Sequence, residues 1–282
     1  MKKIAAVLLS MVITAACLTA CGDSSSSIEA SKMESSSSAE TTTTTSQSET
    51  KTTTTTTAET TTTTTVASTT TQSETTVPQN KNRVVLDVKN IQQKPELPTG
   101  SEITAATIAL NYYGINVSKM ELLNYLKTDK LPENGIGSNP IQVFVGDPKL
   151  NTGYGCIDSV IAKAVKKYFR AANISNFTIE YLDKTDILNL YKEIDSGNPI
   201  IIWATENMKD STNTLTWTDY QGNPIVWKSN EHCVVLIGYD KDKDTVIVSD
   251  PLDPKGTVEY PRSAVEKAYN AMDKQALVIR KK

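Results

Sequence analysis

The sequence predicts an α+β fold for a single domain over residues 83–282, on the basis of three observations. Segments with helical patterns dominate the first part of this region, and segments with strand patterns and tight turns dominate the second. The two kinds do not alternate as they would in a doubly wound parallel sheet. A segment at 101–113 with few charges is apolar enough to form a helix that is buried on most sides, so we expect the domain to pack around it.

Residues 1–21 have the features of a bacterial lipoprotein signal peptide. Lys2 and Lys3 precede a short apolar core, and the run Leu-Thr-Ala-Cys-Gly at 18–22 is similar to a lipobox. Cleavage before Cys21 would leave its thiol to carry a lipid, and more than one acyl chain would hold the protein on the outer side of the cell membrane. The alternative is an ordinary secretory signal with an incidental cysteine.

Residues 22–82 are mostly Ser and Thr and contain almost no large apolar side chains. Such a segment buries too little apolar surface to offset its ordering entropy, so we expect a disordered tether. As a flexible coil it would reach about 40 Å. That reach suits a domain held through or above a cell wall.

In the first part of the domain, each element follows from a local pattern. Residues 83–88 are β-branched and alternate weakly, which indicates a strand. Thr99 and Glu102 have the spacing of a capping box before the apolar helix, and Gly114 suits the left-handed position that ends it. Two further helices are predicted at 118–126 and 157–169, separated by an irregular segment rich in Gly, Pro and Asn.

In the second part, short strands predominate. The run 199–204 is continuously apolar, as in a strand that is buried on both faces. Two tryptophans flank a Gly-Asn turn and predict a hairpin over 214–228. The other predicted strands are 177–181, 231–239, 245–249 and 276–279, and the predicted helices are 185–196 and 263–272.

The candidate reactive residues lie at the ends of these elements. Ser101 falls in the first turn of the buried helix, where free N–H groups and the helix dipole favour negative charge. His232, the only histidine of the chain, begins the strand 231–239, and Asp250 ends the antiparallel return strand. Hairpin pairing would bring Asp250 close to His232, so that one ring nitrogen is held and the other is free to act as a base. The alternatives are a structural histidine and an Asp-Pro turn.

These segments resemble the double-glycine leader peptidase-like branch of the papain-like cysteine peptidases. The resemblance rests on Gln93, on Pro-Glu-Leu-Pro-Thr-Gly-Ser-Glu followed by Leu-Asn-Tyr-Tyr-Gly, on the strand that begins at His232, and on Asp250-Pro251. It implies a papain-like fold, with a helical half that carries the nucleophile and a sheet half that carries the base. It also implies that Gln93 helps stabilise an oxyanion, with Gln92 as the rival.

The chain departs from this family at the nucleophile, because Ser101 stands where the family usually has Cys. A hydroxyl does not ionise at neutral pH as an activated thiol does, and it needs a base aligned for the attack. Three interpretations stay open: an inactive peptidase-like domain that binds peptides, a working Ser101/His232/Asp250 triad, or a serine that only caps the helix. Cys156, which also precedes a helix, is a minor alternative nucleophile.

The sequence therefore leaves two functional classes, and whether the protein is an enzyme is open. One is a surface-anchored hydrolase of peptides or proteins, and the other is a module that binds a peptide or a cell-wall fragment without turnover. The net charge of -3 gives no indication of nucleic-acid binding. No cofactor is indicated, and one histidine with two separated cysteines, Cys156 and Cys233, does not form a metal-binding pattern. These two cysteines are expected to be buried thiols, with a disulfide as the alternative.

Overall fold

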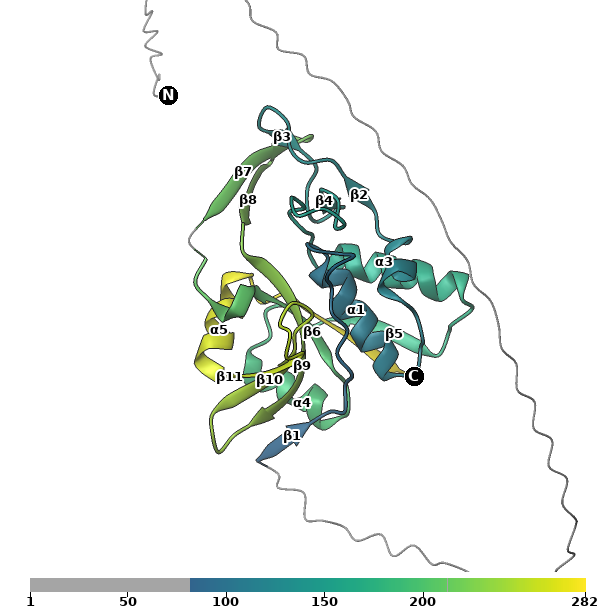
Figure 1. The fold of residues 1–282 in the computed structure, drawn as a ribbon, viewed down its shortest axis with the longest axis vertical. Coiled ribbons are helices and arrows are strands. Elements are labelled where there is room, and N and C mark those ends of the chain that lie inside the picture. Colours follow the sequence, from purple (N-terminus) through teal and green to yellow (C-terminus); the bar gives the residue numbers. More distant parts are fainter. Residues whose placement is uncertain (1–81, 212) are drawn as a thin grey trace, which may run out of the picture. The chain divides into compact units, whose positions relative to one another are not determined.

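The computed structural model describes residues 82–211 and 213–282 (Figure 1). The predicted signal peptide, Cys21 and nearly all of the predicted tether at 22–82 lie outside these ranges. Within the described residues, no helix combines the length and the apolar character needed to cross a membrane.

An antiparallel sheet forms the centre of the domain, with strands in the order β11–β10–β9–β6–β12–β5 and with β1 paired to β9. Its strands are β1 (Arg83–Val85), β5 (Phe177–Tyr181), β6 (Ile200–Thr205), β9 (Glu231–Asp240), β10 (Thr245–Ser249), β11 (Thr257–Pro261) and β12 (Ala276–Lys281). The longest strand, β9, lies between β10 and β6 and is buried over nearly all of its length. At the start of β9, residues 231–234 pair with β6 alone among the described strands, because the pairing with β10 covers only Val235–Asp240.

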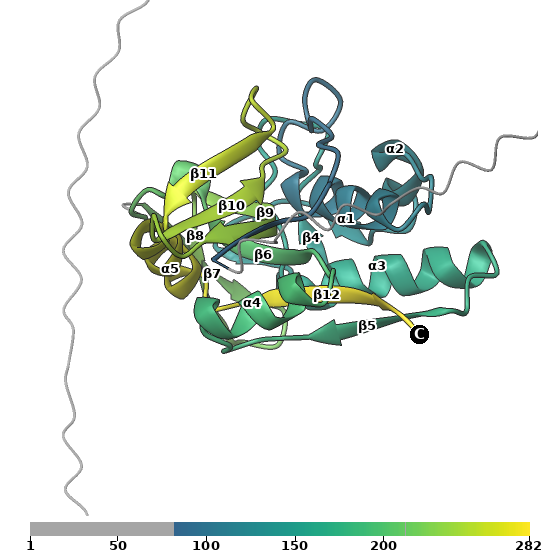
Figure 2. The ribbon, with the colours of Figure 1, turned by 90° about the horizontal axis from the view of Figure 1, so that it is seen from below.

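Helices cover both faces of this sheet (Figure 2). They are α1 (Ser101–Tyr112), α2 (Lys119–Leu123), α3 (Asp158–Ala171), α4 (Ile187–Asp195) and α5 (Arg262–Ala271), with a short 3-10 turn, η1 (Glu206–Met208). Because side chains alternate along a strand, Ile201 and Trp203 of β6 pack with α1 and α3, whereas Ile200 and Ile202 pack with α4 and α5. β6 is continuously apolar because an apolar core packs on each of its two faces.

A smaller sheet stands at one end of the domain, near the top of Figure 1. It contains β3 (Ile136–Gly137), β7 (Thr214–Asp219) and β8 (Pro224–Lys228), and β2 (Thr128–Asp129) pairs separately with β4 (Phe144–Val145). Trp217 and Trp227 of the β7–β8 hairpin pack against Val143 and Val145 in a third apolar cluster. This cluster ties the hairpin to the irregular segment that follows α2.

The predicted α+β class is confirmed, but one local prediction is wrong and several short strands, β2, β3, β4 and β11, were not predicted. The strand at 257–261 was not predicted, because its exposed side chains alternate with only half-buried ones. The capping box is absent: Gly100 is the N-cap of α1, and no side chain caps it. Thr99 Oγ1 instead donates to the carbonyl of Leu150 (2.9 Å), and the Glu102 carboxylate accepts from the N–H of Cys156 (2.8 Å). The side chains of Thr99 and Glu102 therefore bond to residues distant in sequence, in place of the nearby partners that a capping box would give them.

Candidate active site

Ser101 is the first residue of α1, and it is only 3% exposed. The turn before it is tight, because a methyl group on Gly100 would come within 2.9 Å of Leu97 Cβ. The Ser101 hydroxyl accepts a hydrogen bond from the backbone N–H of Cys233 (3.2 Å) on β9. It donates to Glu102 Oε2, at 3.3 Å. The start of the helix is thereby fixed against the strand that carries His232.

His232 and Asp250 form a buried pair, as the hairpin prediction required. His232 Nε2 lies 2.7 Å from Asp250 Oδ1, and both residues are 2% exposed. Asp250 Oδ1 also accepts from the backbone N–H groups of Leu252 and Asp253. Burial acts to raise the pKa of Asp250, but the hydrogen bond and charge of His232, together with these N–H groups, hold it below its ordinary value. The pair therefore fixes the orientation of the imidazole ring.

No hydrogen bond joins Ser101 to His232 among the described residues. With Nε2 held by Asp250, Nδ1 is the ring nitrogen left for chemistry. Contacts between a nucleophile and its base are often loose without substrate and tighten when substrate binds. Ser101 therefore lies against the strand that carries His232, but its hydroxyl donates to Glu102 and not to the imidazole.

Gln93 is the buried member of the two predicted glutamines. Its backbone N–H donates to the carbonyl of Pro251, and its Nε2 donates to the carbonyl of Pro98, each at 2.8 Å. Gln92 Nε2 instead donates to Asn90 Oδ1 (2.7 Å) and to a carbonyl near the end of β10. A glutamine amide has two N–H groups, so one of those on Gln93 is left for another acceptor.

Two buried carboxyl groups at the same place were not recognised from the sequence as part of the site. A methyl group on Gly155 would lie 2.8 Å from Glu102 Oε1 and 2.7 Å from Glu231 Oε2, so both oxygens approach one point. Burial raises the pKa of Glu102 to about 7, although hydrogen bonds from two backbone N–H groups and Ser101 oppose the shift. Burial, and then the charges of Glu102 and Glu206, raise the pKa of Glu231 well above its ordinary value. The sequence signal for Glu102 was an acidic residue inside an otherwise apolar helix.

Cys156 and Cys233 are buried free thiols, so they do not form the disulfide that was the alternative. Burial raises the pKa of both thiols well above the ordinary value, and the nearby charge of Glu102 adds to the effect. A thiol with a raised pKa is a poor nucleophile, which weighs against Cys156 as the alternative. The backbone carbonyl of Cys156 instead accepts a hydrogen bond from Trp203 Nε1–H (2.8 Å), and the backbone N–H of Cys156 donates to Glu102.

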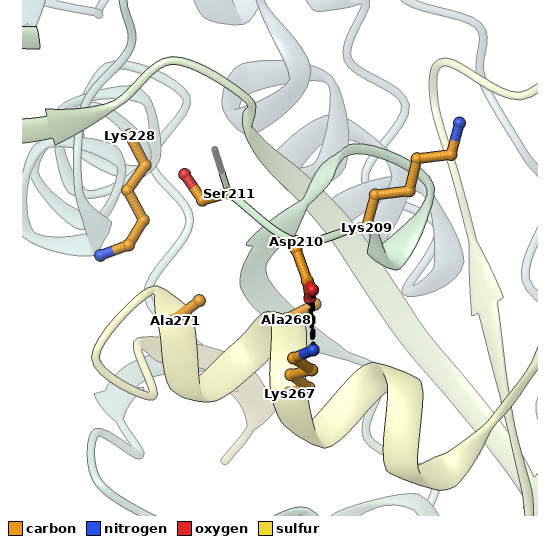
Figure 3. Close-up of a pocket in the computed structure, with 7 residues that line it drawn as sticks. All are labelled: Lys209, Asp210, Ser211, Lys228, Lys267, Ala268 and Ala271. Carbon is orange, nitrogen blue, oxygen red and sulfur yellow. Dashed lines mark hydrogen bonds and ion pairs between the residues drawn. The ribbon is translucent and has the colours of Figure 1, made fainter. Parts of the chain in front are cut away.

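A surface cavity of about 280 Å³ lies between η1 and α5 and contains none of the predicted site residues (Figure 3). The residues that line it are Lys209, Asp210, Ser211, Lys228, Lys267, Ala268 and Ala271. Lys267 Nζ is paired with Asp210 Oδ1 across it, at 2.7 Å. Its lining is basic on balance, but it has no buried reactive group.

Comparison with known proteins gives the family of the chain. A model of the Peptidase C39-like family matches residues 85–277. YvpB of Bacillus subtilis (strain 168), an uncharacterised protein, is 32% identical over 193 residues, which are 68% of this chain and 73% of YvpB. A crystal structure from Bacillus anthracis, described as a C39-like peptidase, is 35% identical with a TM-score of 0.63, over 71% of this chain and 98% of that one. The chain therefore belongs to the Peptidase C39-like family.

Proposed function

We propose that this protein hydrolyses peptide bonds by acyl transfer, with Ser101 as the nucleophile and His232, oriented by Asp250, as the group that carries protons. The observation that supports this most is the buried His232–Asp250 pair, with 2.7 Å between Nε2 and Oδ1. Burying two ionisable groups is costly, and a pure binding module gains nothing from an oriented imidazole. Chemistry at the site gives a reason for keeping the pair.

The surroundings of Ser101 suit an oxyanion. Because Ser101 is the first residue of α1, its backbone N–H has no acceptor within the helix. Gln93 Nε2 donates one of its two N–H groups to the carbonyl of Pro98, close before α1, which leaves the other for an oxyanion. Two such donors stabilise the negative charge that develops on a carbonyl oxygen during attack. We therefore assign Ser101 N–H and Gln93 Nε2 to the oxyanion site.

The substrate we propose is a peptide or protein, in keeping with the B. anthracis relative described as a C39-like peptidase. We also propose that the chain is a lipoprotein, anchored through Cys21 to the outer side of the cell membrane, with residues 22–82 as a tether that lets the domain reach the cell wall. The signal sequence and the Ser/Thr composition support this placement. Globomycin, which blocks lipoprotein signal cleavage, should cause the uncleaved precursor to accumulate, and Cys21→Ser should abolish metabolic labelling of the protein with a fatty acid.

The alternative function is a peptide-binding domain without turnover. One observation favours it: the Ser101 hydroxyl bonds to Glu102 and Cys233, and not to His232. A site of this kind would bind peptide without forming an acyl-enzyme.

Labelling with a fluorophosphonate distinguishes the two. The Ser101 oxygen would attack phosphorus and expel fluoride, and the intact mass of the protein would rise by one phosphonyl group. We expect one adduct that maps to Ser101 and is missing from Ser101→Ala. Absence of an adduct from the unmodified protein, at any pH from 5 to 9, would reject the hydrolase in favour of the binding domain.

A second test examines the geometry alone. In Ser101→Cys, the new thiol should react with iodoacetamide near neutral pH, because His232 and the start of α1 favour a thiolate and outweigh the opposing charge of Glu102. Cys156 and Cys233 are buried, so with Cys17 and Cys21 replaced by Ser the new thiol should be the one that reacts. His232→Ala should slow the reaction. If the new thiol reacts no faster than free cysteine, the site geometry is wrong.

A further inference from the structure

We propose that Glu102 accepts the proton of Ser101 during acylation, so that a carboxylate activates the nucleophile while His232 serves the leaving group. This inference rests on the acyl transfer proposed above. It gives a role to a buried carboxyl group that the Ser101/His232/Asp250 arrangement does not use.

The contacts of the Ser101 oxygen carry the inference. Its hydrogen is directed to Glu102 Oε2, at 3.3 Å, and one lone pair accepts the N–H of Cys233. A hydroxyl oxygen has two lone pairs, so one is left for attack on a carbonyl carbon. The distance to Glu102 is long for a hydroxyl donor, but contacts of this kind tighten when substrate is bound. Glu102 is the acidic group that touches the reacting atom.

Glu102 is held in position for this role. The N–H of Cys156 fixes Oε1, which leaves Oε2 for Ser101. The charged and titratable groups that face Glu102 are the carboxyl of Glu231 and the imidazole of His232 on β9, with the thiols of Cys156 and Cys233. Burial raises the pKa of Glu102 to about 7, so near neutral pH it alternates readily between the carboxylate and the acid. A base with a pKa near the working pH is the most effective kind.

The proton transfers balance over one cycle. The proposed cycle begins with Glu102 as a carboxylate and with a proton on each ring nitrogen of His232, the Nε2 proton being donated to Asp250. As Ser101 Oγ bonds to the carbonyl carbon, its proton passes to Glu102, and the departing amine takes a proton from His232 as the C–N bond breaks. Water then gives a proton to the neutral His232 as it attacks the acyl carbon. The released Ser101 oxygen recovers its proton from Glu102, and both groups return to their initial states.

The serine is the reason that this chain needs such a base. A thiol loses its proton far more readily than a hydroxyl does, and a helix N-terminus favours the resulting anion. A hydroxyl has to lose its proton as it attacks, so an acceptor must be in contact with it at that moment. Glu102 is the contact that the structure provides.

The test is the rate of fluorophosphonate labelling of the full chain between pH 5 and 9. The variants are Glu102→Gln, His232→Ala and Ser101→Ala, with Glu121→Gln, an exposed carboxyl on α2, as the matched control. In Glu102→Gln the amide oxygen can still accept from Cys156, so the helix start is retained while the acceptor for Ser101 is lost. We expect Glu102→Gln to lower the rate by about 10²-fold at pH 8, as for loss of a general base. The rate of the unmodified protein should rise through a step near pH 7 that this variant lacks.

His232→Ala should keep most of the labelling rate, because departing fluoride needs no proton. If Glu102→Gln labels at the unmodified rate with the same pH profile, while Ser101→Ala stays unlabelled, the role of Glu102 is refuted and the serine hydrolase stands. If the unmodified protein is not labelled at any pH, both proposals fail together. If Glu102→Gln does not fold, the pH profile of His232→Ala decides: a step near neutral pH supports the carboxylate base, and a flat profile overturns it.

Discussion

Replacing Glu102 by Gln should flatten the dependence of the domain's stability on pH. The carboxyl group has an ordinary pKa of 4.5, and burial raises it to about 7 in the folded protein. The folded state therefore binds this proton more tightly than the unfolded state does. The stabilisation is complete below pH 4.5 and is lost as the pH rises toward 7, because the buried group must then ionise.

The size of the effect follows from the two pKa values. Each pH unit between them corresponds to about 1.4 kcal/mol, so the free energy of unfolding should fall by about 3 kcal/mol from pH 4.5 to above pH 7. Glu102→Gln has no proton to lose, and it also removes a charge that raises the pKa of Glu231. Both consequences make the variant less sensitive to pH than the unmodified protein.

Urea unfolding at pH 5, 6, 7 and 8, followed by tryptophan fluorescence, measures this difference. Three tryptophans, Trp203, Trp217 and Trp227, are buried and should report unfolding of the domain. Relative to the unmodified protein, Glu102→Gln should gain stability steadily as the pH rises, and the exposed control Glu121→Gln should not. Parallel stability curves for Glu102→Gln and the unmodified protein would refute the claim that Glu102 is buried with a raised pKa.

Three further substitutions test other parts of the structure. Gly238→Ala should lower the free energy of unfolding in urea by about 1–3 kcal/mol, because its methyl group would clash with the carbonyl oxygen of Val84. An unchanged midpoint would mean that β1 is placed wrongly. Trp203→Phe should lower the free energy of unfolding by about 1–3 kcal/mol or more, because the buried carbonyl of Cys156 loses its hydrogen-bond donor. An unchanged free energy of unfolding would contradict that hydrogen bond. Asp250→Asn should slow peptide or ester hydrolysis by about 10²-fold or more, because the imidazole of His232 loses the carboxylate that orients it. Activity equal to that of the unmodified protein would count against the assigned pair.

The sequence was sufficient for the order of the helices and the longer strands and for the placement of Asp250 beside His232. Apolar periodicity reports burial directly, and a strand followed by its antiparallel return places the two ends together. The same local reasoning failed at Thr99 and Glu102, where the capping spacing was present but both side chains found partners distant in sequence. Contacts of this kind depend on the packing of α1 against β9 and the segment before α3, which periodicity does not specify.

The carboxyl pair was missed for a related reason. Glu102 and Glu231 are far apart in the sequence, and nothing local indicates that both approach Gly155. Gly155 itself has φ of +122°, a conformation that favours glycine, and it leaves the space that the two oxygens occupy. Such a cluster becomes visible only when the helix start and the strand start are placed together.

The most direct test of acyl transfer at Ser101 is a time course of intact mass after the protein is mixed with p-nitrophenyl acetate. We expect the mass of the protein to rise by one acetyl group on Ser101 and then to return to its initial value as water hydrolyses the ester. The adduct should last longer in His232→Ala, which lacks the acceptor for the water proton. No acetyl adduct, or one that forms equally in Ser101→Ala, would contradict the account.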